Sequence, residues 1–184
     1  MGVVFNDRLG NPVEPWVQYT LDLFFSKKGM GTAEREFYNE LIHESEHCFE
    51  NYNRHVCSDC RLAGKESYAS KERGCCTKCA SNKGYIFSDM NREFEKIRND
   101  AIEHLWTNTY GYFDNEKHCC KIPRHLRPRT CLGFSCSPDT NFFRGVKHLT
   151  EAICYLKDGS HRNMGMVEEY IEFQKCMHKQ LYTY

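Results

Sequence analysis

Apolar residues recur at intervals of three and four along most of the chain, which is the spacing of one buried face on an α-helix. The pattern predicts a mainly α fold of about five helices, with no strand pair, in a single domain over residues 1–184. Asp158-Gly159 is expected to end the helix that begins near Asp139 or Thr140. The helices are expected to begin near Pro15, Thr32, Ser88 or Asp89, and Asp139 or Thr140, with a last one carrying Val167 to Leu181.

The first helix is expected to run from about Pro15 to Phe25. The other stripes predicted to face the core are Phe37, Leu41, Ile42, Cys48, Phe49 and Tyr52; Met90, Phe94, Ile97, Ala101 and Leu105; Phe142, Val146, Leu149, Ile153 and Leu156; and Val167, Tyr170, Ile171, Gln174, Met177 and Leu181.

Two segments between the predicted helices, 53–88 and 109–138, break the helical pattern and have little apolar material to bury. Loops of this length inside a compact domain need another source of order. Metal ligation supplies one, because forming such a site contributes folding free energy on the order of 10 kcal/mol. We therefore expect both segments to be ordered by metal.

Charge changes the picture of these segments. The chain of 184 residues has a formal net charge of zero, but residues 1–50, 51–88, 89–116, 117–138 and 139–184 carry −5, +4, −4, +5 and 0. Nine of the 12 cysteines lie in the two basic blocks. The cationic segments are therefore the cysteine segments.

The cellular compartment bears on what the cysteines do. The N-terminal residues lack a basic stretch followed by an apolar one, as a secretory signal would have, and no apolar run approaches the ~18 residues of a membrane span. We therefore expect a cytoplasmic protein that does not enter a membrane. In a reducing compartment, clustered cysteines are more often metal ligands than disulfides.

The first cysteine segment has the spacing of a four-cysteine metal site, C-x2-C followed after a gap of fifteen residues by a second C-x2-C. Two intervening residues let a tight turn point both sulfurs at one ion, and two such turns complete a tetrahedron. The predicted ligands are Cys57, Cys60, Cys76 and Cys79, with Cys75 as the neighbour of Cys76.

The second cysteine segment offers a further set of thiols at Cys120, Cys131 and Cys136. The fourth ligand is left open among Cys119, Cys75, His118 and His125. The side chains of adjacent residues point in different directions. In each of the pairs Cys75-Cys76 and Cys119-Cys120, one sulfur is therefore expected to serve a second site or none.

A resemblance to a known family enters with the run Cys120-Lys121-Ile122, Arg127-Pro128-Arg129-Thr130-Cys131 and then Phe134 and Cys136. This run resembles the C-x-I-Y-x-x-R-P-x-x-C-x-x-F signature of the YkgJ-type cysteine-cluster family. Cys57, Cys60, Cys75, Cys76 and Cys79 match the upstream cysteine cluster of that family loosely. The chain has Pro123 in place of the usual tyrosine, one extra residue before Arg127, and a longer gap after Cys60.

The resemblance implies metal chelation. Its relatives include iron-sulfur proteins that modify protein lysines, so it raises a 4Fe-4S cluster beside Zn2+, and thiolates suit both. The sequence does not distinguish the two cofactors. The predicted function is a metal-binding cysteine-cluster protein with a structural, metal-handling or electron-transfer role. An iron-sulfur-dependent redox or protein-modifying enzyme is one alternative.

Basic residues around the second cysteine segment support another alternative, a zinc-ordered module for nucleic acid or a protein partner. The same cations can instead offset the negative charge of metal-bound thiolates. A binding patch requires them to point outward along one face. The residues concerned are Lys117, Lys121, Arg124, Arg127 and Arg129, with His118, His125, Tyr110, Tyr112 and Phe113.

Two weaker patterns lie inside predicted helices. His43, Glu44 and His47 fit H-E-x-x-H, in which two histidines would bind zinc and the glutamate would act as the general base of a metalloprotease. The alternative is a chance match, because this motif recurs on acidic helices and no third ligand is evident in the sequence. The helical cysteines, which are expected to behave as small buried hydrophobic residues, are Cys48, Cys154 and Cys176.

Overall fold

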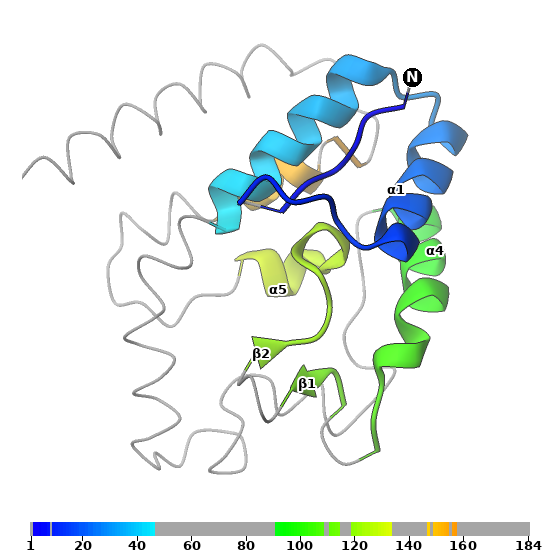
Figure 1. The fold of residues 1–184 in the computed structure, drawn as a ribbon, viewed down its shortest axis with the longest axis vertical. Coiled ribbons are helices and arrows are strands. Elements are labelled where there is room, and N and C mark those ends of the chain that lie inside the picture. The colour runs from blue at the N-terminus through cyan, green and yellow to red at the C-terminus, as the bar shows by residue number, and fades with distance from the viewer. Residues whose placement is uncertain are drawn as a thin grey trace, which may run out of the picture.

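The computed structural model describes residues 2–7, 9–46, 91–108, 111–114, 119–133 and, within 147–157, all but 148 and 155. This part of the chain is mainly helical, as predicted, and Figure 1 shows α1 and α4 lying side by side. The helix predicted over Val167 to Leu181 and the segment 53–88 lie outside the described residues. The elements are α1 (Pro15–Lys27), a helix over 32–46, α4 (Arg92–Ile102), η2 (Glu103–Leu105), β1 (Phe113–Asp114), β2 (Cys119–Cys120), η3 (Arg124–Leu126), α5 (Arg129–Gly133) and a helix within 147–157.

Helix α1 confirms the prediction for the first helix and continues two residues further. Pro15 occupies the first helical position, where its missing N–H costs nothing. The helix ends because Gly29 adopts a left-handed conformation with φ of 65°. The Gly29 N–H then donates to Ser26 and the Met30 N–H to Phe25, which satisfies two terminal carbonyls.

The helix over 32–46 buries Tyr38, Leu41 and Ile42, so two predicted core positions are confirmed and Tyr38 is added. Thr32 is its first helical residue rather than its N-cap, since the Gly31 carbonyl accepts the Arg35 N–H. Phe37, which was also predicted, is partly buried against the core, and Cys48, Phe49 and Tyr52 lie outside the described residues.

Helix α4 begins later than predicted. Its N-cap is Asn91, not Ser88 or Asp89, because the Asn91 side chain accepts hydrogen bonds from the backbone of Glu93 and Phe94. The fully buried face also differs from the predicted stripe, since it is formed by Phe94, Arg98 and Ile102, with Ile97 and Leu105 partly buried.

The helix within 147–157 buries the predicted positions Leu149, Ile153 and Leu156. It also buries Thr150 and Lys157, as well as Cys154, which the sequence predicted to behave as a small hydrophobic residue. The proposed start and end of this helix lie beyond the described part of the chain.

Residues of the second cysteine segment join the helices in one core, which corrects the expectation that 109–138 has little to bury. Tyr112, Ile122, Leu126 and Leu132 are each at most 3 % exposed. The segment also forms a short antiparallel strand pair, β1 with β2, that the sequence did not predict. Hydrophobic packing therefore contributes to the order of residues 119–133.

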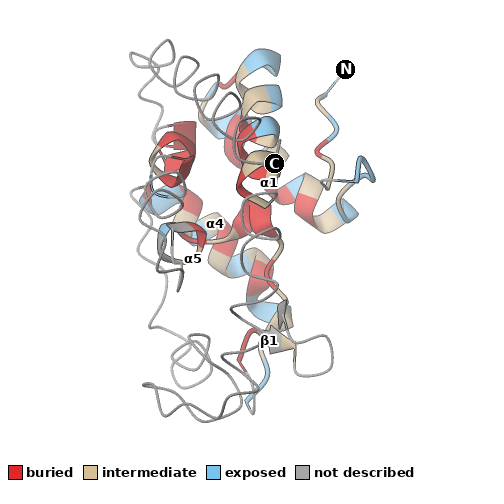
Figure 2. Ribbon diagram, turned by 90° about the vertical axis from the view of Figure 1, so that its left-hand side faces the viewer, coloured by how far each residue is buried: buried red, intermediate tan, exposed pale blue. Residues whose placement is uncertain are grey.

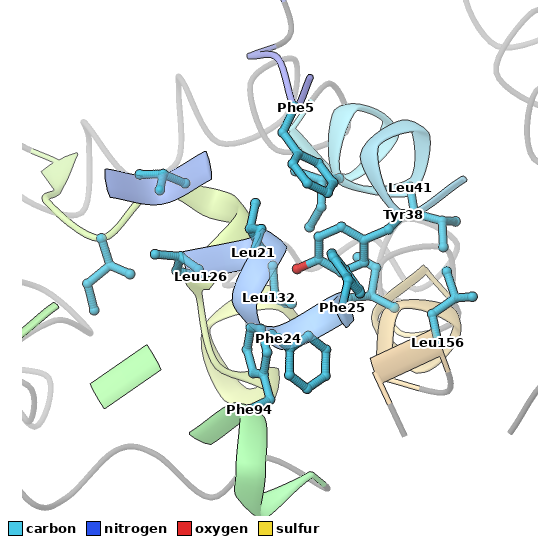
Figure 3. Close-up of a cluster of buried hydrophobic side chains, with 14 of the residues drawn as sticks. Phe5, Leu21, Phe24, Phe25, Tyr38, Leu41, Phe94, Leu126, Leu132 and Leu156 are labelled. Carbon is cyan, nitrogen blue, oxygen red and sulfur yellow. The ribbon is translucent and has the colours of Figure 1, made fainter. Parts of the chain in front are cut away.

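Aromatic rings occupy the centre of this core. Phe24 packs against Phe25 and Phe94 at centroid distances of 5.2 and 4.7 Å, and Phe25 meets Tyr38 at 5.0 Å. Figure 2 shows the buried residues concentrated where the helices face one another, and Figure 3 shows Leu126 and Leu132 beside the rings. Among the described helices, none combines the length and apolar character needed to cross a membrane.

Replacing Phe24 with alanine is expected to lower the free energy of unfolding by about 3–5 kcal/mol, because the ring is fully buried. Tyr19→Ala on the same helix is the matched control. Its side chain is 69 % exposed, so we expect a change within about 0.5 kcal/mol. Urea unfolding followed by circular dichroism measures both, and equal losses would contradict the assigned core.

Candidate metal centre

Two of the eight candidate ligands, Cys120 and Cys131, lie in the described part of the chain. Both are half-buried and pack against the core. The other candidates lie outside the described residues, and they are Cys57, Cys60, Cys75, Cys76, Cys79 and Cys136. No group of three metal-binding side chains occurs among the described residues.

Cys120 is positioned by the strand pair. It lies opposite Phe113, and the next residue, Lys121, donates its N–H to the Tyr112 carbonyl at 2.8 Å. Ile122 follows and is 1 % exposed, so it anchors the end of β2 in the core. The thiol therefore sits at the edge of the core on a backbone fixed on both sides.

Cys131 is positioned by the first turn of α5. The Pro128 carbonyl accepts hydrogen bonds from the N–H groups of Cys131 and Leu132, both at 3.0 Å. Leu132 is fully buried and holds this turn against the core. The backbone at Cys131 is therefore held in place, as it is at Cys120, and the side chain of Cys131 is half-buried.

The Arg127 side chain ties these two cysteine regions together. Its Nε donates to the Ile122 carbonyl at 3.0 Å, so the residue before Pro128 closes a loop back to the residue two after Cys120. Ile122 and Arg127 are therefore partners in one contact between the two cysteines.

The residues between Ile122 and Arg127 dock on the helix over 32–46. Arg124 is buried, and its Nε and Nη2 donate to Ser45 Oγ at 3.1 and 2.6 Å. The Tyr38 hydroxyl donates to the His125 carbonyl at 2.5 Å. These contacts fix the loop that carries the two cysteines.

Asn39 is the meeting point of this loop with the N-terminal segment. Its Oδ1 accepts the Asn6 N–H at 3.2 Å and lies 3.0 Å from His125 Nε2. The Asn6 N–H can only donate, so the atom facing both partners is the oxygen. His125 Nε2 therefore carries a hydrogen and donates it to Asn39.

Burial also changes the proton affinity of His125. Loss of water lowers its pKa from 6.5 to about 3, and the nearby His43 and Lys157 add to this effect while Asp7 opposes it. The ring is therefore neutral at physiological pH and acts as a structural hydrogen-bond donor.

His43 makes a similar structural contact, with its Nε2 2.7 Å from the Asn6 carbonyl. A carbonyl oxygen only accepts, so this nitrogen is a donor and is occupied. The lone pair of the neutral ring is then at Nδ1, so this contact leaves the H-E-x-x-H hypothesis open. His47 lies outside the described residues.

The outward-facing basic patch is not formed as expected. Tyr112, Arg124 and His125 are each at most 5 % exposed, so they cannot line a binding face. Lys121 Nζ donates to the Leu105 carbonyl, and Arg127 Nε donates to the Ile122 carbonyl. Arg129 is exposed. Lys117, His118 and Tyr110 lie outside the described residues, as does the side chain of Phe113.

The sequence patterns missed Asn39, Arg98 and Lys157. Arg98 and Lys157 are fully buried, although charged side chains on helices normally indicate a solvent-exposed face. Nothing in their spacing distinguishes them from surface residues. The sequence does not indicate the role of Asn39 either, because that role depends on Asn6 and His125 lying next to it in the fold.

Replacing Asn39 with alanine is expected to lower the free energy of unfolding by about 2–4 kcal/mol, because two partly buried donors lose their acceptor. Glu40→Ala, at the next and exposed position of the same helix, is expected to change it by less than about 0.5 kcal/mol. Chemical denaturation compares them. Similar stability of the two variants would show that Asn39 does not join these segments.

Acidification is expected to destabilise the fold below pH 6.5 through His125. The unfolded chain binds a proton at this residue near pH 6.5, whereas the folded protein resists until about pH 3. Stability therefore falls with pH by up to about 1.4 kcal/mol per unit. Measuring unfolding at pH 7 and pH 5 tests this.

The variant His125→Gln retains an N–H donor for Asn39 but does not titrate, so its loss between the two pH values should be smaller. The exposed His104, replaced by glutamine, serves as the control and should behave like the unmodified protein. An unchanged pH dependence in His125→Gln would contradict the assignment.

Comparisons with known proteins add no family. No family model, curated protein or solved structure matches the chain.

Proposed function

We propose that this protein is a metal-binding cysteine-cluster protein, holding Zn2+ or an iron-sulfur cluster in a structural, metal-handling or electron-transfer role. The observation that carries the proposal is that Cys120 and Cys131 lie at the two ends of one hydrogen-bonded loop. Each is a half-buried thiol on a fixed backbone, and the Arg127 contact to the Ile122 carbonyl closes the loop between them. Preorganised, partly accessible thiols are suited to ligation.

The donor chemistry agrees with either cofactor. Thiolates bind both Zn2+ and iron-sulfur clusters, and the cysteine spacing elsewhere in the chain supplies the further sulfurs that either requires. We infer that Cys120, Cys131 and Cys136 belong to one set, whose fourth ligand is open among Cys119, Cys75, His118 and His125. Cys57, Cys60, Cys76 and Cys79, with Cys75 adjacent, form the other. Membership of the YkgJ-type family remains part of this proposal.

Metal content of anaerobically purified protein tests the function. We expect either a colourless protein with one or two zinc ions per chain or a brown protein with iron and acid-labile sulfide. The ultraviolet-visible spectrum and elemental analysis distinguish these outcomes. A protein that contains neither metal and whose cysteines are paired as disulfides would contradict the proposal.

A pair of cysteine variants makes this test site-specific. Cys131→Ala is expected to lose one full equivalent of zinc or one cluster, because it removes a ligand. Cys154→Ala is the control, since its side chain is buried in the helix within 147–157 and is assigned to packing. Its metal content should equal that of the unmodified protein. Equal metal content in both variants would remove Cys131 from the ligand set.

A further inference from the structure

The described residues before α1 form an arm that is held together by its own hydrogen bonds. We call residues 2–13, apart from residue 8, the arm. The Val13 N–H donates to the Phe5 carbonyl at 3.0 Å, and the Asp7 N–H donates to the Asn11 carbonyl at 2.7 Å. Because these contacts stay within the arm, they are kept when the arm moves as a unit.

Side chains of the next two helices bind the backbone of the arm. Gln18 on α1 accepts the Phe5 N–H through Oε1 and donates from Nε2 to the Val3 carbonyl, both at 2.9 Å. The helix after α1 supplies Asn39, which accepts the N–H of the residue after Phe5 at 3.2 Å. It also supplies His43, whose Nε2 donates to the carbonyl of that residue at 2.7 Å. These side chains thus satisfy successive backbone groups of the arm.

Phe5 anchors the arm through its side chain. The ring is fully buried, stacks on Phe25 at a centroid distance of 5.6 Å and meets Tyr38 edge-on at 6.3 Å (Figure 3). When a surface binds an extended peptide, main-chain hydrogen bonds give affinity and a pocket for a side chain gives specificity. The arm is held in the same way. We call the residues that hold it the arm-binding surface, which consists of Gln18, Phe25, Tyr38, Asn39 and His43.

A short hinge connects the arm to α1. Glu14 has a non-helical conformation with φ of −55° and ψ of 144°, and Pro15 begins the helix without an N–H that could bind the arm. Both residues are exposed. Short hinges favour the exchange of an element between copies, and such exchange is a common route to dimers. Rotation at this hinge would release the arm with its internal contacts intact.

Exposed apolar side chains lie on both elements that the hinge joins. Among the described residues, the large apolar side chains that are exposed are Val4 and Leu9 of the arm and Tyr19 and Leu23 of α1, with exposed fractions from 37 to 72 %. Tyr19 and Leu23 are four residues apart and therefore share one face of α1. Apolar surface gathered in one part of a molecule indicates an interaction site. In an exchanged pair each hinge crosses to the other copy, so a second copy would cover this part of the chain.

We propose that the arm-binding surface takes the arm of a second copy of this chain, which gives a dimer by reciprocal arm exchange. Each contact that the arm makes with its own surface is remade with the surface of the other copy. In a single copy the arm is tethered, which gives it an effective concentration in the millimolar range. The closed monomer therefore predominates in dilute solution, and the share of dimer grows with protein concentration. The inference does not depend on metal binding.

Two complementary full-length variants test the exchange. Phe5→Ala removes the anchor of the arm and leaves the arm-binding surface intact. Gln18→Glu leaves the arm intact but places a carboxylate against the Val3 carbonyl and against Asp22, which accepts a hydrogen bond from the Gln18 amide at 2.9 Å. Only in a mixture does an intact arm meet an intact surface whose own arm lacks its anchor. We expect the mixed pair to associate at least about tenfold more tightly than either variant associates with itself.

Native mass spectrometry distinguishes the mixed dimer by mass, and sedimentation velocity measures its affinity. The control is Gln18→Glu mixed with unmodified protein, whose surface is filled by its own tethered arm. This mixture should associate at least about tenfold more weakly than the complementary pair. Phe5→Leu keeps an apolar side chain and replaces Phe5→Ala if that variant does not fold.

Either of two results would overturn the inference. One is a complementary pair that associates no more tightly in the mixture than each variant does alone. The other is unmodified protein that remains entirely monomeric at about 1 mM, where the exchanged arm competes with the tethered one.

Discussion

The pair of hydrogen bonds accepted by Asn39 is the constraint on which this arrangement depends. Asn39 Oδ1 accepts hydrogen bonds from the Asn6 backbone and the His125 ring. The N-terminal segment, the helix over 32–46 and the loop between Cys120 and Cys131 therefore meet at this atom. The partners are far apart in sequence and partly shielded from water, where an unpaired donor is costly. The loop cannot leave the helix without breaking this contact and the Arg124 contact to Ser45.

Docking of the loop explains how a segment rich in polar residues becomes ordered. Its apolar residues enter the same core as Phe24 and Phe94, and its buried polar residues find partners on the helix over 32–46. The two described thiols are left at the edge of this core. Metal binding at these thiols would add to the order that core packing gives residues 119–133. The interior cations Arg98 and Lys157 belong to the same scaffold through Phe94.

The helices could be predicted from sequence because helical periodicity and capping residues are local signals. Pro15, Leu41 and Ile153 behave as their patterns indicate. The predicted start of α4 was wrong because Ser88, Asp89 and Asn91 are all good N-caps, and only the three-dimensional position selects Asn91. The strand pair is too short to show an alternating pattern.

The site was less predictable because its supporting contacts are long-range. Cysteine spacing identified candidate ligands, and two of them are described. His43, Arg124 and His125 make hydrogen bonds to partners far away in the sequence, so no local pattern showed that Arg124 and His125 are buried rather than outward-facing. Lys157 is a comparable case, since its burial follows from how its helix meets Phe94 and Arg127.

The central claim is that cysteine sulfurs of this chain hold a metal. X-ray absorption spectroscopy of the anaerobically purified protein, at the zinc or iron edge, tests it most directly. The account predicts a first coordination shell dominated by sulfur, at about 2.3 Å for zinc. A shell of nitrogen and oxygen without sulfur would contradict it.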